Sequence, residues 1–390
     1  MVEMEIDFLD VAERLMVKFA YQTGLSSSLK PRRYLWTDAF AVCIFLELYR
    51  QSGDEKFRRL ALDLVDQVHY VLGRHREDDV RKGWISGLDD EEGWRHPTVG
   101  GLRIGKRLHE RSPEEPFDEV LEWERDGQYY HYLIKWMYAL NRISRVTGNT
   151  IYNRWAIELA KKAHSSFVYK TLDGRRRIYW KMSIDLSRPL VTSMGQHDPL
   201  DGFVVYNELQ ASAPEDPSWP SLEVEIKEIA EIIDDVDWTT SDPLGIGSLL
   251  WNAYALARLI KSGHLDRIDL LLDMLNSSLL GLELYLLIKP MRFPSGMRLA
   301  FRELGLTIGL KAVIKLEKLI LGEQRFLSEK ELCSTIKSLR YYTWLIDEIE
   351  GFWLSPINRE SYNWKKHEDI NTVMLATSLI PDGFLGTQES

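Results

Sequence analysis

Apolar residues recur at helical spacing along most of the chain, and two kinds of helix alternate. Residues 40–49 are apolar on almost every side, which is typical of a helix buried all round. The next stretch, 54–74, carries Leu64, Val68 and Leu72 in one apolar stripe with charged residues beside it. That pattern indicates an amphipathic helix on the outside of a fold. The sequence therefore predicts an inner helix followed by an outer partner.

The same pairing recurs toward the C-terminus. The expected pairs are 128–147 with 151–169, 199–213 with 222–233, 243–261 with 265–288, 299–321 with 328–349, and 369–379 with the N-terminal run 6–22. Glycines stand where these helices should end, at Gly53, Gly148, Gly263 and Gly322. The four-residue sequences His197-Asp-Pro-Leu and Ser241-Asp-Pro-Leu open two successive inner helices. About six hairpins of similar length form a repeat pattern, and inner helices this apolar favour closure into a ring.

Two segments interrupt the helical pattern. Residues 78–125 are polar and rich in Gly, Pro and Trp, and a loop this long inside a compact fold is usually functional. Residues 172–190 contain Asp173-Gly174 followed by alternating apolar residues, which predicts a small β-hairpin. No Ser/Gly-rich linker divides the chain. We therefore expect one all-α domain over residues 1–390, an (α/α)6 toroid with one small β-hairpin and a long loop at its mouth.

The composition restricts the classes of binding partner that we expect for this protein. The 390 residues are 45% hydrophobic and carry a net charge of -10, which disfavours a nucleic-acid or anionic-membrane partner. The most apolar stretch, 268–288, is interrupted by charged residues, and the acidic N-terminus lacks the features of a secretory signal. We expect a cytoplasmic protein that does not span a membrane, and the oligomeric state stays open. The two cysteines, Cys43 and Cys333, are expected to be buried free thiols.

Chemistry-bearing residues gather at the predicted starts of the inner helices, which should share one mouth of the ring. Asp38 and Asp198 are the candidate catalytic carboxylates, because cleavage of a glycosidic bond needs one carboxyl group as acid and a second as base or nucleophile. A structural role competes in each case. Asp198 precedes a proline and would suit a helix N-cap, while Asp38 in a first helical turn would favour the helix dipole.

Other side chains at these starts are candidates for holding a substrate. They are Trp36, Glu124, Asp126, Tyr130, His131, His197, Asp201, Arg302 and His367. Asp201 would equally suit a capping box, and Glu124, Asp126 and His131 would equally belong to a surface loop. Histidine titrates near neutral pH, so His131 could also transfer a proton. Tryptophans near the helix starts and on the irregular segments could stack on sugar rings; they are Trp36, Trp84, Trp94, Trp123, Trp180 and Trp364.

We expect neither a metal nor another cofactor. The cysteines have no zinc-binding spacing, and in His367-Glu-Asp369 adjacent helical residues point apart. Gly100-Gly-Leu-Arg-Ile-Gly-Lys106 matches a phosphate loop only as far as its lysine, because Arg107 replaces the Ser or Thr that would hold magnesium.

The alternation of inner and outer helices, with Trp, Asp, His and Tyr at the inner starts, resembles the (α/α)6 toroids of the six-hairpin glycosidase-like superfamily. Sugar isomerases of the N-acylglucosamine 2-epimerase type are similar. The resemblance spans nearly the whole chain and is architectural. It implies a carbohydrate-active enzyme, glycoside hydrolase-like, acting on a small-molecule or oligosaccharide substrate. The alternatives are a sugar isomerase or epimerase that uses His131, His197 and His367, and a non-catalytic binding or scaffold protein.

Overall fold

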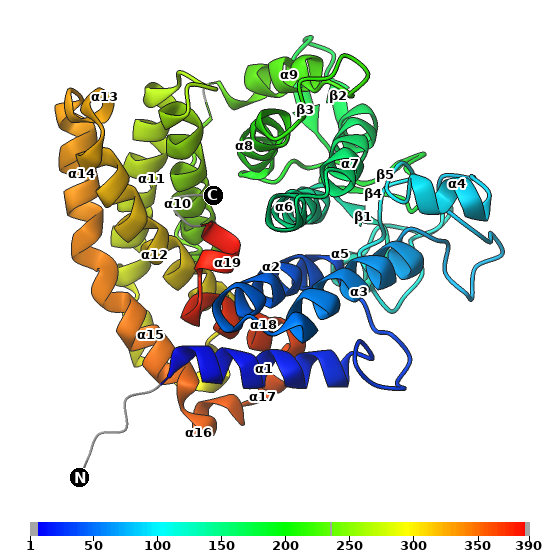
Figure 1. Cartoon of the computed structure of the whole chain (residues 1–390), viewed down its shortest axis with the longest axis horizontal. Coiled ribbons are helices and arrows are strands. Elements are labelled where there is room, and N and C mark those ends of the chain that lie inside the picture. The colour runs from blue at the N-terminus through cyan, green and yellow to red at the C-terminus, as the bar shows by residue number, and fades with distance from the viewer. Residues whose placement is uncertain (1–6, 235, 387–390) are drawn as a thin grey trace. The chain divides into compact units, whose positions relative to one another are not determined.

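The computed structural model describes residues 7–234 and 236–386, and most of them are helical. The chain divides into two compact units, one formed by residues 20–235 and the other by residues 1–19 with 236–390. We refer to them as the first and second unit. Figure 1 labels the helices and strands of both.

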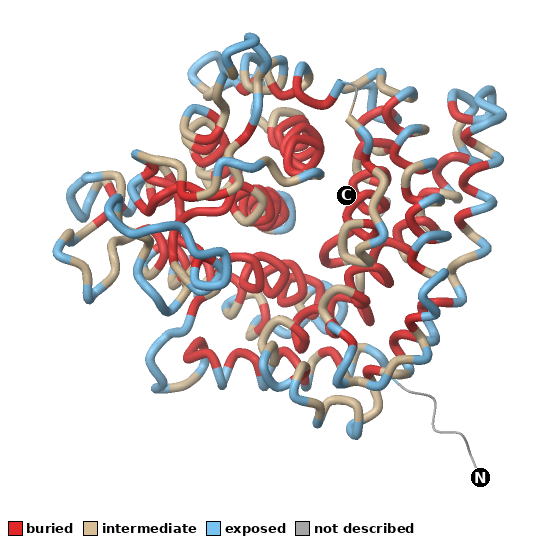
Figure 2. Tube along the Cα trace, turned by 180° about the vertical axis from the view of Figure 1, so that it is seen from behind, coloured by how far each residue is buried: buried red, intermediate tan, exposed pale blue. Residues whose placement is uncertain are grey.

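The first unit contains three of the predicted helical hairpins. They are α2 (Leu35–Ser52) with α3 (Glu55–Leu72), α6 (Tyr130–Thr147) with α7 (Ile151–Phe167), and α8 (Asp198–Ala211) with α9 (Glu223–Ile233). The inner members α2, α6 and α8 are buried along most of their length, whereas α3 and α9 bury only one face. Figure 2 shows the same contrast between buried helices and exposed connections. The alternation predicted from the apolar pattern is confirmed here.

The second unit contains the remaining long helices, again as predicted within a few residues. They are α1 (Phe8–Gln22), which ends in the first unit, α10 (Pro243–Lys261), α11 (Ile268–Leu287), α12 (Ala300–Gly322), α14 (Lys330–Arg340), α15 (Trp344–Leu354) and α18 (Glu368–Leu379). Short elements join them: η1 (Pro290–Arg292), η2 (Ser295–Met297), α13 (Gln324–Leu327), η3 (Tyr341–Thr343), α16 (Pro356–Arg359), α17 (Tyr362–Lys366) and α19 (Asp382–Leu385). The outer helix predicted over 328–349 is thus two helices separated by η3. An ion pair between Lys18 and Glu368, at 2.7 Å, joins α1 to α18 as expected; Ile6 lies outside the described residues.

Gly53 and Gly148 are the C-caps of α2 and α6 as expected, whereas Gly263 directly follows Ser262, the C-cap of α10. Gly53, Gly148 and Gly263 have φ values of 71°, 71° and 78°, in the left-handed region that glycine adopts without steric cost. The prediction for Gly322 was wrong, because α12 includes this residue and its C-cap is Glu323.

Two long inner helices of the second unit approach each other through glycine. A Cβ added to Gly247 of α10 would lie 2.2 Å from the backbone oxygen of Gly305 in α12, and one added to Gly309 would lie 2.6 Å from the Gly247 Cα. Only hydrogen fits at these positions, so the two backbones pack closer than side chains would allow. Figure 1 shows α10 and α12 side by side.

The irregular segments contain more structure than the sequence indicated. The long loop 78–125 includes two short helices, α4 (Asp90–Arg95) and α5 (Glu119–Glu124). The predicted hairpin exists as β2 (Val168–Lys170) paired with β3 (Arg176–Ile178), with the Asp173-Gly174 turn between them. A second sheet has the order β1-β4-β5, formed by Gln128–Tyr129, Lys181–Met182 and Pro189–Val191. This sheet joins the start of α6 to the segment that precedes α8.

The structure modifies two expectations drawn from the composition, one about a helix that could span a membrane and one about the burial of the cysteines. By length and composition, residues 268–292 could cross a membrane, with a mean hydropathy of 1.5, although α11 packs against α10 and α14 in this unit. A helix of this kind also occurs in the cores of proteins that enter no membrane.

Both cysteines are free, and Cys43 is buried as predicted, but Cys333 is partly exposed.

Candidate active site

The start of α6 carries a run of aromatic residues, of which some are buried and others are partly exposed. Tyr129 belongs to β1, where it pairs with Lys181 of β4, and Tyr130 begins the helix. Tyr130 is fully buried and its hydroxyl donates to the Tyr206 hydroxyl at 3.1 Å. His131, in contrast, keeps 24% of its side chain exposed. The structure therefore places Tyr130 in the packing between helices and leaves His131 accessible at the helix start.

The start of α8 presents Asp198 to the same place. Asp198 is the first residue of α8, and the N-cap is His197, which forms no side-chain capping bond. The N-cap role considered for Asp198 is therefore wrong. Its carboxyl group folds back over Gly195, since a Cβ added to Gly195 would lie 2.5 Å from the Asp198 Oδ1. The side chain is only 9% exposed.

Asp198 and His131 form the central pair of the site. The His131 Nδ1 and the Asp198 Oδ2 lie 3.9 Å apart, and both atoms are buried without a hydrogen-bond partner among the described residues. Burial and the nearby Asp201 raise the pKa of Asp198 to about 8. Burial lowers the pKa of His131 to about 4. Near pH 7 the pair is thus a neutral carboxylic acid beside a neutral imidazole.

A buried ion pair lies one helical turn below. The Lys135 Nζ donates to the Asp201 Oδ2 at 2.9 Å, with both side chains more than nine-tenths buried. Asp201 lies three residues after Asp198 on α8, and Lys135 lies four after His131 on α6, so each pair joins the same faces of the two helices. Because Lys135 compensates Asp201, the two aspartates can stand close together with one ionised and the other protonated. Lys135 was not among the predicted site residues, because α6 also carries Arg142 and Arg145 and the sequence does not distinguish these cations.

Aromatic rings surround the exposed side of His131. The Trp180 ring is nearly parallel to that of His131, at 9° and a centroid distance of 6.0 Å, and Trp123 contacts Trp180 edge-on at 4.8 Å. Tyr129 lies 5.1 Å from Trp180, and Tyr132 lies 4.7 Å from His131. Trp123 is 46% exposed. Partly exposed aromatic faces beside hydrogen-bonding groups suit a sugar ring, which has an apolar face and a polar rim.

The second predicted catalytic carboxylate, Asp38, occupies a different environment. It is 1% exposed, its Oδ2 accepts the backbone N–H of Tyr34 at 2.9 Å, and its Oδ1 lies 3.5 Å from the Arg33 Nη1. These contacts hold the start of α2 and match the structural alternative. Trp36 on the same helix is 5% exposed and packs on Phe40, so both residues belong to the interior of α2.

The two acidic residues at the end of the long loop have opposite environments. Asp126 is fully buried; it forms an ion pair with Arg103 at 2.5 Å and accepts the backbone N–H of Gly105 at 3.0 Å. It therefore anchors the loop. Glu124, the last residue of α5, is exposed. His197 is partly exposed at the N-cap of α8, directly before Asp198.

The last two predicted residues lie in the second unit. The Arg302 Nη1 pairs with the Asp242 Oδ1 at 2.7 Å, and Asp242 also caps α10 by accepting the backbone N–H of Gly245. His367 is the N-cap of α18, and its ring lies 5.6 Å from that of Phe301. Arg302 and His367 belong to the second unit, whereas the Asp198–His131 pair lies in the first, and their role in binding a substrate stays a prediction.

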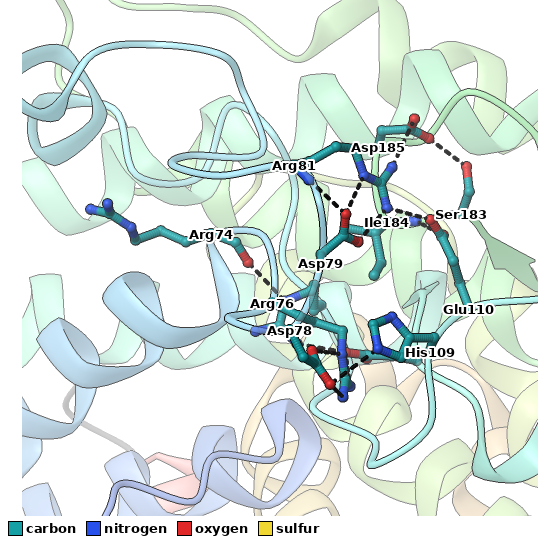
Figure 3. A network of polar contacts seen from close by, with 12 residues as sticks. Arg74, Arg76, Asp78, Asp79, Arg81, His109, Glu110, Ser183, Ile184 and Asp185 are labelled. Atoms are coloured by element: carbon teal, nitrogen blue, oxygen red, sulfur yellow. Dashed lines mark hydrogen bonds and ion pairs between the residues drawn. The ribbon is translucent and has the colours of Figure 1, made fainter.

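A network of ion pairs and hydrogen bonds fastens the long loop to the turn between β4 and β5 (Figure 3). Arg81 contacts Asp79 at 2.9 Å, Glu110 at 2.7 Å and Asp185 at 3.2 Å. Glu110 also accepts the backbone N–H of Ile184 at 2.5 Å, next to the β4–β5 turn.

Nearby, Asp78 lies between Arg76 at 2.9 Å and His109 at 3.0 Å. These contacts hold the loop in one place, and none of them involves Asp198 or His131. Among the described residues, no group of three or more His, Cys, Asp and Glu side chains is placed to hold a metal ion.

No protein-family model matches the chain, and no curated protein is similar to it in sequence. Solved structures share its fold at low identity. An inactive variant of an α-1,6-mannanase from Salegentibacter sp. HEL1_6, in complex with α-1,6-mannotetrose, superposes with a TM-score of 0.53 at 12% identity, covering 96% of this chain and 99% of that one. The Lin0763 protein from Listeria innocua gives 0.51 at 12% identity and 97% coverage of both chains.

A third structure, cellobiose 2-epimerase from Spirochaeta thermophila, gives a TM-score of 0.50 at 11% identity, covering 95% of this chain and 98% of that one. The chain has an all-α (α/α)6 toroid fold, which confirms the expected fold class. The likeness covers nearly the whole chain and concerns the fold.

Proposed function

We propose that this protein is a carbohydrate-active enzyme, glycoside hydrolase-like, in which Asp198 donates the proton to the leaving oxygen. The observation that carries the proposal is the Asp198–His131 pair: a carboxyl group with a pKa of about 8, 3.9 Å from an imidazole, at the edge of a partly exposed aromatic cluster. A general acid must be protonated at the working pH and reach the reacting oxygen. Asp198 meets the first condition because burial and Asp201 disfavour its charged form.

The surroundings support a sugar as the substrate. Trp123 and Trp180 offer ring faces, while His131 and Tyr132 offer polar atoms next to them. Solved proteins of this fold include an inactive α-1,6-mannanase variant in complex with α-1,6-mannotetrose and a cellobiose 2-epimerase. We propose a small-molecule or oligosaccharide substrate, a cytoplasmic location and catalysis that needs no added cofactor.

The test compares wild type with Asp198→Asn on two kinds of glycoside. Ordinary glycosides need a proton on the leaving oxygen, whereas a 2,4-dinitrophenyl glycoside leaves without one. The variant should lose about 10²- to 10⁴-fold in kcat on the ordinary glycoside and far less on the activated one. Equal losses on both, or no loss on either, would remove Asp198 from the role of acid.

Asp242→Asn is the matched control. Asp242 occupies the same place in the second Asp-Pro-Leu sequence, but it caps α10 and pairs with Arg302. Asparagine caps helices as well as aspartate does, so this variant should keep the activity of the wild type.

A second candidate, sugar isomerisation or epimerisation, is favoured by one observation at the same site. The His131 Nδ1 has no hydrogen-bond partner in the described parts of the chain, and its low pKa keeps the imidazole neutral and able to accept a proton. Abstraction of a proton next to a carbonyl group would place deuterium on carbon when the reaction runs in heavy water. Hydrolysis leaves the carbon-bound hydrogens unchanged, so this experiment separates the two functions.

A further inference from the structure

Hydrolysis by the Asp198 acid requires a second carboxylate, and the inference that follows rests on the proposed function. When the glycosidic C–O bond breaks, the anomeric carbon must receive an oxygen, from water activated by a base or from a carboxylate directly. That second group has to be ionised and open to the substrate. The acidic residues around the aromatic cluster can be compared on these two requirements.

Four of these acidic residues are buried, and each forms an ion pair with an Arg or Lys side chain. The pairs are Asp38 with Arg33 at 3.5 Å, Asp126 with Arg103 at 2.5 Å, Asp201 with Lys135 at 2.9 Å, and Glu122 with Lys181 at 2.8 Å. A buried carboxylate that compensates a buried cation cannot also react, because withdrawing its charge would leave the cation buried and unpaired. These four residues therefore hold the structure together.

Glu124 differs from all of them. It is exposed, and in the described parts of the chain its carboxylate takes part in no hydrogen bond or ion pair. Its backbone is nonetheless fixed, because it ends α5 and its carbonyl oxygen accepts the N–H of Leu108 at 3.3 Å.

Glu124 also stands at the aromatic cluster. The preceding residue, Trp123, contacts Trp180, and Trp180 stacks on His131. Burial is the main cause of the raised pKa of Tyr34 and of Tyr129, and the charge of Glu124 adds to both shifts. Tyr129 in turn lies 5.2 Å from His131.

We propose that Glu124 is the second catalytic carboxylate and acts as the general base on water. In this step Asp198 gives its proton to the glycosidic oxygen as that oxygen leaves with the bonding electron pair. The water oxygen forms the new bond to the anomeric carbon, and Glu124 takes the proton that this water releases. Asp198 ends ionised and Glu124 protonated, and proton exchange with solvent restores both. Attack by water from the face opposite the leaving group inverts the anomeric configuration.

The experiment measures Glu124→Gln against Glu119→Gln on the ordinary and the 2,4-dinitrophenyl glycoside. Glu119 is exposed on the same short helix, so its variant controls for the loss of a surface charge. A missing base slows both substrates, unlike a missing acid. Glu124→Gln should therefore lose about 10²-fold or more in kcat on each, while Glu119→Gln keeps wild-type rates and both variants keep the wild-type melting temperature.

Two further readouts separate a base from a structural residue. Sodium azide should restore turnover to Glu124→Ala by replacing the activated water, and the product should be a glycosyl azide. The first sugar released by the wild type, followed by NMR, should carry the inverted anomeric configuration. Wild-type rates in Glu124→Gln, or a retained configuration, would overturn the assignment. Absence of wild-type activity on every glycoside would instead overturn the proposed function, and this outcome is seen before any variant is made.

Discussion

Replacing Asp198 by asparagine should change the pH dependence of stability as well as the activity. The pKa of this carboxyl group is raised from 3.8 to about 8 in the folded chain. Below pH 3.8 the group is protonated in both the folded and the unfolded state and adds nothing that depends on pH. As the pH rises from 3.8 to about 8, the unfolded state loses the proton while the folded state keeps it. The wild type is therefore destabilised progressively over this window.

The size of the effect follows from the shift. At pH 7 the folded group is protonated about three pH units above its ordinary pKa, and each unit corresponds to roughly 1.4 kcal/mol, so the penalty is about 4 kcal/mol at most. The side chain is 9% exposed, so solvent screening reduces this figure little. Asparagine has a similar shape and no proton to lose. Asp198→Asn should match the wild type near pH 4 and exceed its free energy of unfolding by a few kcal/mol at pH 8.

Urea unfolding at pH 4, 6 and 8 measures this difference directly. Asp242→Asn is again the control, because Asp242 is partly exposed, paired with Arg302 and used as a cap. Its curve should run parallel to that of the wild type, lowered by about 1 kcal/mol or less for the lost ion pair. If the Asp198→Asn and wild-type curves are also parallel, then Asp198 is ionised in the folded protein. The acid role proposed for it would then be refuted.

Three other predictions test the packing and the site. Gly247→Ala should lower the free energy of unfolding by about 1–3 kcal/mol, because its methyl group would meet the Gly305 backbone at 2.2 Å, and thermal unfolding measures the loss. His69 is buried, accepts from Trp136 and has a pKa lowered to about 3, so stability should fall as the pH drops from 6.5 toward 3; His69→Gln should flatten this acid limb, and an unchanged limb would contradict the burial argument. Trp180→Ala should raise KM for the sugar more than it lowers kcat, with an unchanged KM counting against stacking.

Much of the fold could be read from the sequence because the apolar pattern and the end signals agree. The predicted limits of the helix over 243–261 are the observed ones, since Asp242 caps it and Pro243 begins it. Agreement was less exact at the end of α12. Gly322, expected as the C-cap, is instead the last helical residue, and the C-cap is Glu323. The glycine contact between α10 and α12 had no visible signal, because a glycine inside a helix does not show which residue it will meet.

The candidate site was only partly predictable. Asp198 and His131 were both named as candidates, yet nothing in the sequence places them 3.9 Å apart. Asp38 and Asp198 were both predicted as catalytic carboxylates with a competing structural role at a helix start. In the structure Asp38 lies beside Arg33, whereas burial and the nearby Asp201 raise the pKa of Asp198. Lys135 is invisible as a site residue until α6 and α8 are packed together.

The two Asp-Pro-Leu sequences show which properties follow from the sequence and which depend on the tertiary structure. The sequence by itself determined that each opens an inner helix, because proline suits the first turn and an apolar run follows. It determined the all-α class for the same reason, since the pattern repeats at a period that only helices have. Tertiary structure alone decided that Asp242 meets a backbone N–H and Arg302, while Asp198 folds over Gly195 and faces His131. The difference arises because a carboxyl group takes its pKa and its chemistry from neighbours that are distant along the chain.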